Sequence, residues 1–129
     1  MILLDTHVLV WAGDGSKNLS KTAASEIRRA RSRGGIAISA ISIWELAQML
    51  IRERIRVYGS PETALERLLE GVIVRPITPE IAILAAQFPE NYSHDPADRL
   101  IGATARAEGL TLVTRDGNIR KSPLLKTVW

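Results

Sequence analysis

The sequence contains no cysteine and no long apolar run. Without cysteine, the chain has no disulfide, no thiolate metal site and no cysteine nucleophile. No apolar stretch approaches the roughly 18 residues of a membrane-spanning helix. An acid at Asp5 also comes too early in the sequence for a signal peptide. We therefore expect a protein of the cytoplasm that has no membrane partner.

Histidine and aromatic residues are also scarce, with two histidines, three tryptophans, two tyrosines and one phenylalanine. No predicted element places His7 and His94 on one face, which disfavours a zinc site built on imidazole ligands. Trp11 and Trp44 fall on the apolar faces of predicted helices. We expect both tryptophan rings to belong to the core.

The sequence does contain enough apolar residues for one folded domain, and it carries a small excess of base. Its 129 residues are 46% hydrophobic and 24% charged, which predicts a single domain over residues 1–129. The net charge is +3, and arginines cluster at residues 28–33 and 52–56. Because guanidinium grips phosphate through two hydrogen bonds, these clusters favour a nucleic-acid partner. Solvated helix faces are the alternative explanation.

Short apolar runs alternate with helical patterns along the whole chain. The predicted strands are residues 2–4, 36–39, 72–74 and 111–114, with a short fifth expected within 124–129. These runs are continuously apolar, which is typical of a parallel sheet that is covered on both faces. The sequence therefore predicts an α/β fold with a central parallel sheet of about four to five strands and helices on both faces.

Capping residues predict where the helices begin. Thr6 is expected to cap a short helix over residues 7–11, and Ser42 is expected to form a capping box with Glu45 three positions later. Asp95 and Pro96 are a typical cap and first residue for a helix that ends at Gly109. Residues 115–117 are expected to form a turn.

Acidic side chains come from four separate segments of this predicted fold. In a parallel α/β sheet, the carboxyl ends of the strands and the amino ends of the helices share one edge, where ligands bind. Five carboxylates map to that edge: Asp5, Glu45, Asp95, Asp98 and Asp116. Each has a local explanation as a cap or turn residue. Gathered carboxylates repel one another, however, so the joint pattern favours a bound cation or a role in proton transfer.

Ligands that offer only oxygen suit a hard divalent ion, Mg²⁺ or Mn²⁺. Such an ion promotes phosphodiester hydrolysis by activating water and neutralising charge on the leaving oxygen. The hydroxyls of Thr6 and Thr114 stand beside the acids and are expected to orient them. Arg99 follows Asp98 and is expected to pair with a neighbouring carboxylate or to reach a phosphate.

Four segments in this order resemble the PIN-domain nucleases, and within them the VapC-type toxins of bacterial and archaeal toxin–antitoxin pairs. The segments are Leu3–His7, Ile41–Leu46, His94–Ile101 and Leu112–Asp116. No single segment is diagnostic, but together they span nearly the whole chain with order and spacing kept.

The resemblance implies a Mg²⁺- or Mn²⁺-dependent endoribonuclease with a PIN-like fold. The residues that match the acidic quartet of the family, and that would hold the metal, are Asp5, Glu45, Asp98 and Asp116. Asp95 matches an additional acid of one subgroup, and Thr114 matches the hydroxyl residue before the last acid. The resemblance further implies an RNA substrate, a homodimer and a cognate antitoxin that covers the acidic pocket.

Three other interpretations are considered. A PIN-domain ribonuclease of RNA processing, without a toxin role, has the same residues. A non-catalytic PIN-like binding protein is disfavoured because the acidic set is complete. A phospho-acceptor receiver domain needs an aspartate at the end of a mid-chain strand, whereas the strand at 72–74 leads into Arg75 and Pro76.

Overall fold

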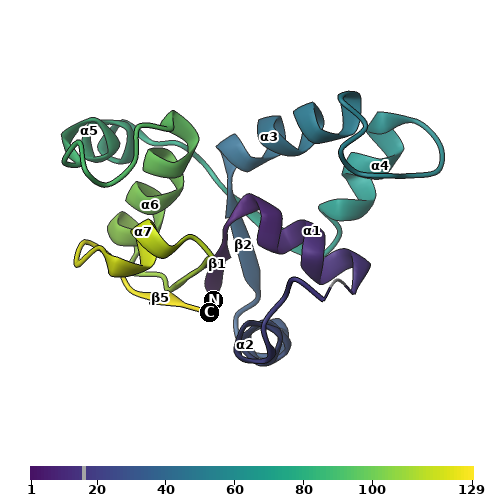
Figure 1. Ribbon diagram of the computed structural model, residues 1–129, viewed down its shortest axis with the longest axis horizontal. Coiled ribbons are helices and arrows are strands. Elements are labelled where there is room, and N and C mark those ends of the chain that lie inside the picture. Colours follow the sequence, from purple (N-terminus) through teal and green to yellow (C-terminus); the bar gives the residue numbers. More distant parts are fainter. Residues whose placement is uncertain (16) are drawn as a thin grey trace.

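A single parallel sheet lies at the centre of the molecule (Figure 1). The structure, a computed structural model, describes residues 1–15 and 17–129. Within these residues the sheet has five strands in the order β3-β2-β1-β4-β5, and every neighbouring pair is parallel. The strands are β1 (Ile2–Leu4), β2 (Ile36–Ser39), β3 (Val72–Arg75), β4 (Leu112–Val113) and β5 (Thr127–Val128).

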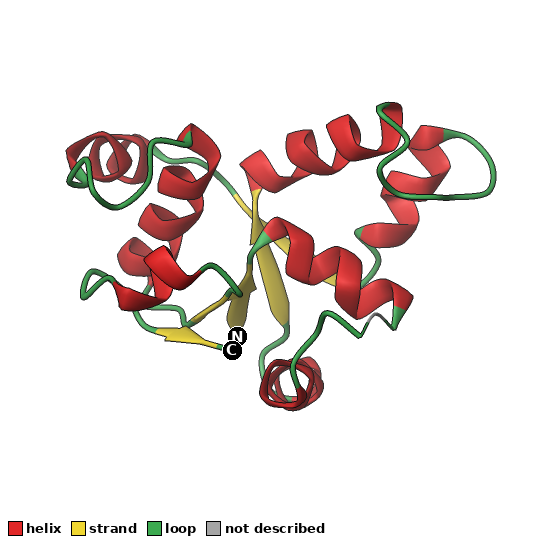
Figure 2. Cartoon of the chain, in the orientation of Figure 1, coloured by secondary structure: helices red, strands yellow, loops and turns green. Residues whose placement is uncertain are grey.

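Helices cover both faces of the sheet, as predicted (Figure 2). Those of the described residues are α1 (Thr6–Asp14), α2 (Lys21–Ser32), α3 (Ala40–Ile51), α4 (Pro61–Leu68), α5 (Pro79–Gln87), α6 (Pro96–Glu108) and α7 (Gly117–Lys121). One core cluster joins the sheet to α1, α2 and the buried side of α3, and a second joins it to α5, α6 and α7. None of these helices is both long and apolar enough to cross a membrane.

The strands contribute alternate side chains to the two cores. In β1, Ile2 and Leu4 belong to the α1–α2 side, whereas Leu3 belongs to the α5–α6 side. Both sides of the strand are buried, which explains why its sequence is continuously apolar. The edge strand β3 is only partly covered, and its side chains Ile73 and Val74 are more than a third exposed.

The strand order reverses next to β1. From β1 the chain proceeds to β2 and β3 on one side, whereas β4 and β5 lie on the other side. A reversal of this kind creates a crevice at the carboxyl ends of the central strands, where α/β proteins bind ligands. The register pairs Leu4 with Val113, so Asp5 and Thr114 leave the sheet side by side at this crevice.

Two predicted helix starts are wrong and one short helix was missed, and each correction affects an acidic residue or its neighbour. Asp5, not Thr6, caps α1 and accepts the N–H of Thr6 at 2.9 Å. Helix α3 begins at Ala40 with Ser39 as its cap, so Ser42 lies inside the first turn and forms no capping box. The stretch predicted as a turn continues into α7, which Asp116 caps through two backbone N–H groups at 2.9 and 3.2 Å.

The start and the end of α6 were predicted correctly. Asp95 caps this helix by accepting the N–H of Ala97 at 2.8 Å, and Gly109 ends it with a left-handed backbone.

Trp11 is partly buried and packs against the core. Trp44 was expected in the core, but it is 58% exposed on α3.

Candidate active site

The end of β1 is tied to the end of β4 through a buried hydroxyl. Thr114 donates to Oδ2 of Asp5 at 2.8 Å, and its oxygen accepts the backbone N–H of Asp116 at 3.1 Å. The other oxygen of Asp5 caps α1. One threonine therefore fixes the position of one acid and the backbone of the other. Thr114 thus contacts the carboxylate of Asp5 and the backbone of Asp116, and its role in orienting the acids for function stays a prediction.

A second hydroxyl positions Glu45, which lies in the second turn of α3. Thr6 donates to Oε1 of Glu45 at 2.6 Å, and the hydroxyl of Ser42 lies 2.8 Å from the same threonine oxygen. Because Thr6 has a single hydroxyl proton, Ser42 acts as the donor in the second contact. Both hydroxyl residues are fully buried. Helix α1 thereby holds the acid of α3 from the opposite side of the crevice.

The third segment brings Asp98 in the first turn of α6. Ser93, in the loop before the helix, donates to Oδ2 of Asp98 at 2.9 Å. The same serine oxygen accepts the backbone N–H of Asp95 at 3.1 Å. Asp95 is exposed, and its carboxylate serves mainly as the helix cap.

Neighbouring carboxylates affect the pKa of three of the acids, Asp5, Glu45 and Asp98. Burial and neighbouring carboxylates raise the pKa of Asp98 from 3.8 to about 6, with burial the larger cause. The neighbours concerned are Asp95, Asp5 and Asp116. Burial likewise raises the pKa of Asp5 and of Glu45, and the charge of Asp5 adds to the rise at Glu45. That these acids form one functional site, as the sequence predicts, stays a prediction.

The raised pKa of Asp98 predicts a specific pH dependence of stability without divalent metal. An acid that binds its proton more tightly in the folded state stabilises the fold fully below its unfolded pKa. That contribution is lost as the pH rises from 3.8 through about 6. We expect Asp98→Asn to remove this decline, because asparagine has no proton to lose in that range.

Urea denaturation in EDTA, from pH 4 to pH 8, measures the difference between wild type and Asp98→Asn. The variant should gain stability relative to wild type across this window and keep the gain at higher pH. The exposed Glu80→Gln variant on α5 serves as a control for loss of one carboxylate. A constant difference between wild type and Asp98→Asn would show that folding leaves the pKa of Asp98 unchanged.

The donor atoms of the site are chemically suited to a hard divalent cation. They are carboxylate oxygens, supported by the hydroxyls of Thr6, Thr114 and Ser93. Among residues 1–15 and 17–129, no three acidic or histidine side chains converge tightly enough to enclose an ion. Mg²⁺ commonly keeps several waters and is held by one or two carboxylates together with substrate phosphates, so an open set of acids fits it.

Arg99 contacts backbone carbonyls. Its guanidinium donates to the backbone carbonyls of Ala85, Phe88, Pro89 and Ser93, which lie at the end of α5 and in the following loop. The expected pairing with a carboxylate or a phosphate is therefore replaced by a structural contact. Arg99 supports the site indirectly, because it holds the loop that carries the serine bonded to Asp98.

Two serines of the site were not recognised from the sequence as partners of the acids. Ser42 was explained as a cap, although its position three residues into α3 and next to an apolar stretch is compatible with burial. Ser93 precedes the motif at 94–101 and has no neighbour in sequence that reveals its role. Its hydroxyl reaches Asp98, five residues later, only because the loop folds back toward the first turn of α6. The sequence alone does not show that fold.

Comparison with known proteins assigns the fold to a family. A family model described as PIN domain matches residues 2–123. The chain belongs to the PIN-domain family. This PIN domain is 39% identical to Ribonuclease VapC22 of Mycobacterium tuberculosis, over 99% of this chain and 98% of that protein. The resemblance to VapC-type PIN toxins is thereby confirmed.

Solved structures with the same fold are also similar to this PIN domain over their whole length. VapBC2 from Rickettsia felis, bound to a DNA fragment from its promoter, gives a TM-score of 0.76 at 20% identity, covering 99% of this chain and 98% of that chain. A toxin–antitoxin complex from Klebsiella pneumoniae gives a TM-score of 0.72 at 21% identity, with 100% and 97% covered. At these identities the likeness supports the fold alone.

Proposed function

We propose that this PIN domain is a metal-dependent endoribonuclease and the toxin of a toxin–antitoxin pair. The observation that carries the proposal is the convergence of Asp5, Glu45, Asp98 and Asp116 at the crevice where the strand order reverses. Support also comes from the full-length relative, which is a ribonuclease, and from structural neighbours that are toxin–antitoxin complexes.

In this proposal the four carboxylates hold Mg²⁺ or Mn²⁺. When bound, the ion orients and acidifies the attacking water and neutralises charge on the scissile phosphate. The protein contributes orientation, since Thr114 fixes Asp5 and Thr6 fixes Glu45 at hydrogen-bond distances of 2.8 and 2.6 Å. Ser93 fixes Asp98 in the same way. Asp95, exposed beside them, adds negative charge to the rim of the site.

The proposed partners are an RNA substrate in the cytoplasm, a cognate antitoxin that covers the acids, and a second copy of the chain. Trp44 and Ile51 on α3 are 58% and 69% exposed, and such apolar side chains are typical of surfaces that bind another protein. Their exposure supports a protein partner without distinguishing the antitoxin from a second copy.

The test is cleavage of a panel of structured and single-stranded RNAs by the purified protein with Mg²⁺, with Mn²⁺ or with EDTA. We expect cutting that requires the metal and that is lost in Asp98→Asn prepared identically, because the variant lacks one carboxylate ligand. Glu80→Gln should cut as the wild type does. Cutting that persists in EDTA or in Asp98→Asn would contradict the proposed site.

Growth after induction in a bacterial host separates the toxin role from RNA processing. A toxin should arrest growth as wild type and not as Asp98→Asn. RNA cleavage in vitro without growth arrest would instead favour a PIN-domain ribonuclease of RNA processing.

A further inference from the structure

Tyr92 carries a buried polar group that the proposed metal site does not explain. The residue lies in the loop between α5 and α6 and is 3% exposed. Its hydroxyl is the one buried side-chain oxygen or nitrogen of residues 1–15 and 17–129 that has no hydrogen-bond partner. Leaving a buried hydroxyl without a partner is costly, and buried tyrosines usually find one. The position therefore points to a partner that is not a protein group.

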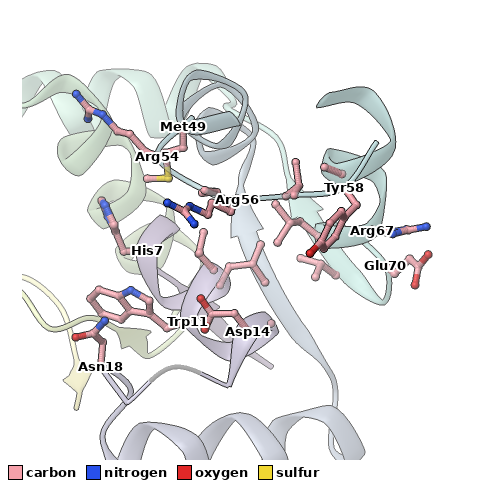
Figure 3. A pocket seen from close by; sticks show the side chains of 18 of the residues that line it. His7, Trp11, Asp14, Asn18, Met49, Arg54, Arg56, Tyr58, Arg67 and Glu70 are labelled. Atoms are coloured by element: carbon pink, nitrogen blue, oxygen red, sulfur yellow. The ribbon is translucent and has the colours of Figure 1, made fainter. Parts of the chain in front are cut away.

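A large cleft of the molecule does not supply that partner (Figure 3). This cleft has a volume of about 780 Å³ and is formed mainly by α1, the end of α3, residues 52–59 and α4. It borders the core cluster on the α1 side of the sheet, whereas Tyr92 belongs to the cluster on the α5 and α6 side. Neither Tyr92 nor any of the five acids lines the cleft. A molecule bound there would not reach the hydroxyl.

The Tyr92 hydroxyl lies against α6, one helical turn beyond Asp98. A Cβ atom at Gly102 would lie 2.1 Å from the hydroxyl oxygen, so the tyrosine occupies space that a side chain at this position would fill. Residues four apart share one face of a helix, and helical side chains tilt towards the N-terminus of the helix. The hydroxyl is therefore on the same face of α6 as the side chain of Asp98.

Three acids of the candidate site act on this hydroxyl. Burial raises the pKa of Tyr92, and the charges of Asp98, Asp5 and Asp116 raise it further. Asp98 has the largest effect of the three. All three belong to the acids proposed to hold the metal. The tyrosine keeps its proton at neutral pH and is able to donate it in a hydrogen bond on the side of the carboxylates.

The loop between α5 and α6 holds Tyr92 in this position. Its ring packs edge-on against Phe88 with the ring centroids 4.8 Å apart, and its N–H donates to the carbonyl of Pro89 at 3.0 Å. The next residue, Ser93, donates to Oδ2 of Asp98 at 2.9 Å. Two consecutive residues of one loop thus serve the start of α6, one by direct contact with the carboxylate and the other from one turn further along the helix.

Buried water commonly bridges polar groups that the protein leaves without a partner, and such a water makes about three hydrogen bonds. We propose that Tyr92 is a positioning residue whose hydroxyl donates to an ordered water shared with the carboxylate of Asp98. Together with Ser93, this bridge fixes the orientation in which Asp98 meets a divalent cation. The inference rests on the proposed function, because it concerns the same metal site, and it adds a residue from outside the acidic set.

Urea denaturation in EDTA tests the bridge without metal. Tyr92→Phe should lower the urea midpoint, because it removes one end of a bridge to a charged group. In an Asp98→Ala background the other end is already gone, so Tyr92→Phe should leave the midpoint unchanged or raise it. If the hydroxyl instead has no partner at all, Tyr92→Phe raises the midpoint equally in both backgrounds, because an unpaired buried hydroxyl is removed. That result would overturn the bridge.

Binding of Mn²⁺ alone, measured by isothermal titration calorimetry, tests the positioning role. We expect Tyr92→Phe to weaken Mn²⁺ binding by about tenfold, because loss of a group that orients a metal-binding side chain typically has an effect of that size. Tyr58→Phe is the matched control. It removes the same hydroxyl from the other tyrosine of the chain, which is 95% exposed and lies outside the acidic set. The control should bind Mn²⁺ as the wild type does.

The outcomes separate this inference from the proposed function. If the wild type binds Mn²⁺ and cleaves RNA, but Tyr92→Phe keeps the wild-type affinity for Mn²⁺, the role of Tyr92 is overturned and the metal site stands. If the wild type binds no Mn²⁺ and cleaves RNA in EDTA, the proposed metal site fails and this inference fails with it.

Discussion

Replacing Asp5 by asparagine is expected to slow RNA cleavage by more than about a hundredfold while the protein stays folded. Asp5 lies where β1 ends at the reversal of strand order, and its charge acts on both Glu45 and Asp98. It therefore raises the pKa of one acid on α3 and of one on α6. Neutralising it removes a central ligand from the proposed metal site.

The fold should tolerate this substitution because asparagine preserves the hydrogen bonds. Its carbonyl oxygen accepts the N–H of Thr6 as before. The bond to Thr114 reverses, because the asparagine amide donates to the hydroxyl oxygen of Thr114, whereas in the wild type Thr114 donates to Asp5. Burial raises the pKa of Asp5, which means that its charged form is costly to bury. An uncharged asparagine avoids that cost. The variant should therefore be at least as stable as the wild type at neutral pH.

Initial cleavage rates and urea midpoints, measured on the same preparations, test both parts of the prediction. Glu80→Gln provides the matched control, since it removes an exposed carboxylate from the first turn of α5. An Asp5→Asn protein that is folded and cleaves RNA at the control rate would remove Asp5 from the site.

Gly102→Ala is expected to destabilise the protein by about 2 kcal/mol, although alanine normally favours a helix. A Cβ atom at Gly102 would lie 2.1 Å from the hydroxyl oxygen of Tyr92 and 2.8 Å from its ring carbon. Tyr92 is buried, and its ring packs edge-on against Phe88 at 4.8 Å. The ring has little room to retreat, so α6 or the loop before it must shift.

Two further variants isolate the cause of the effect. Gly13→Ala places a methyl group in α1 with only ordinary contact to Leu68 at 3.8 Å, and it should be neutral or stabilising. In Tyr92→Phe the substitution removes a buried hydroxyl that has no hydrogen-bond partner among the described residues. Combined with Gly102→Ala, it should recover part of the lost stability. Urea denaturation of the four proteins measures this coupling, and an additive pair would refute the proposed contact.

Much of the fold was predictable because a strand that is buried on both sides consists almost entirely of apolar residues. A strand covered on both sides, such as β1 or β2, has no polar position, and its continuous apolar run marks both its place and its parallel pairing. The acids were predictable for the same reason. Once the strands are placed, the residues that follow them must lie at one edge of the sheet.

The local partners of the acids were harder to predict because several residues compete for the same role. Ser39 and Ser42 are both capping residues by type, and only the end of β2 decides between them. Trp44 was misplaced because α3 is apolar on nearly every face, so its periodicity does not show which side is buried. Arg99 contacts carbonyls whose position depends on how the loop folds back.

The contacts of Arg99 have a consequence for the entropy of substrate binding. The loop between α5 and α6 has no regular hydrogen-bonding pattern of its own, and one guanidinium supplies donors to the carbonyls of Phe88, Pro89 and Ser93. Fixing the backbone of one residue costs roughly 1–2 kcal/mol of conformational entropy. For this loop the cost is met when the protein folds, before any substrate binds. In the proposed function, the substrate would therefore meet Ser93 and Asp98 already in place, and its binding would not have to order the loop.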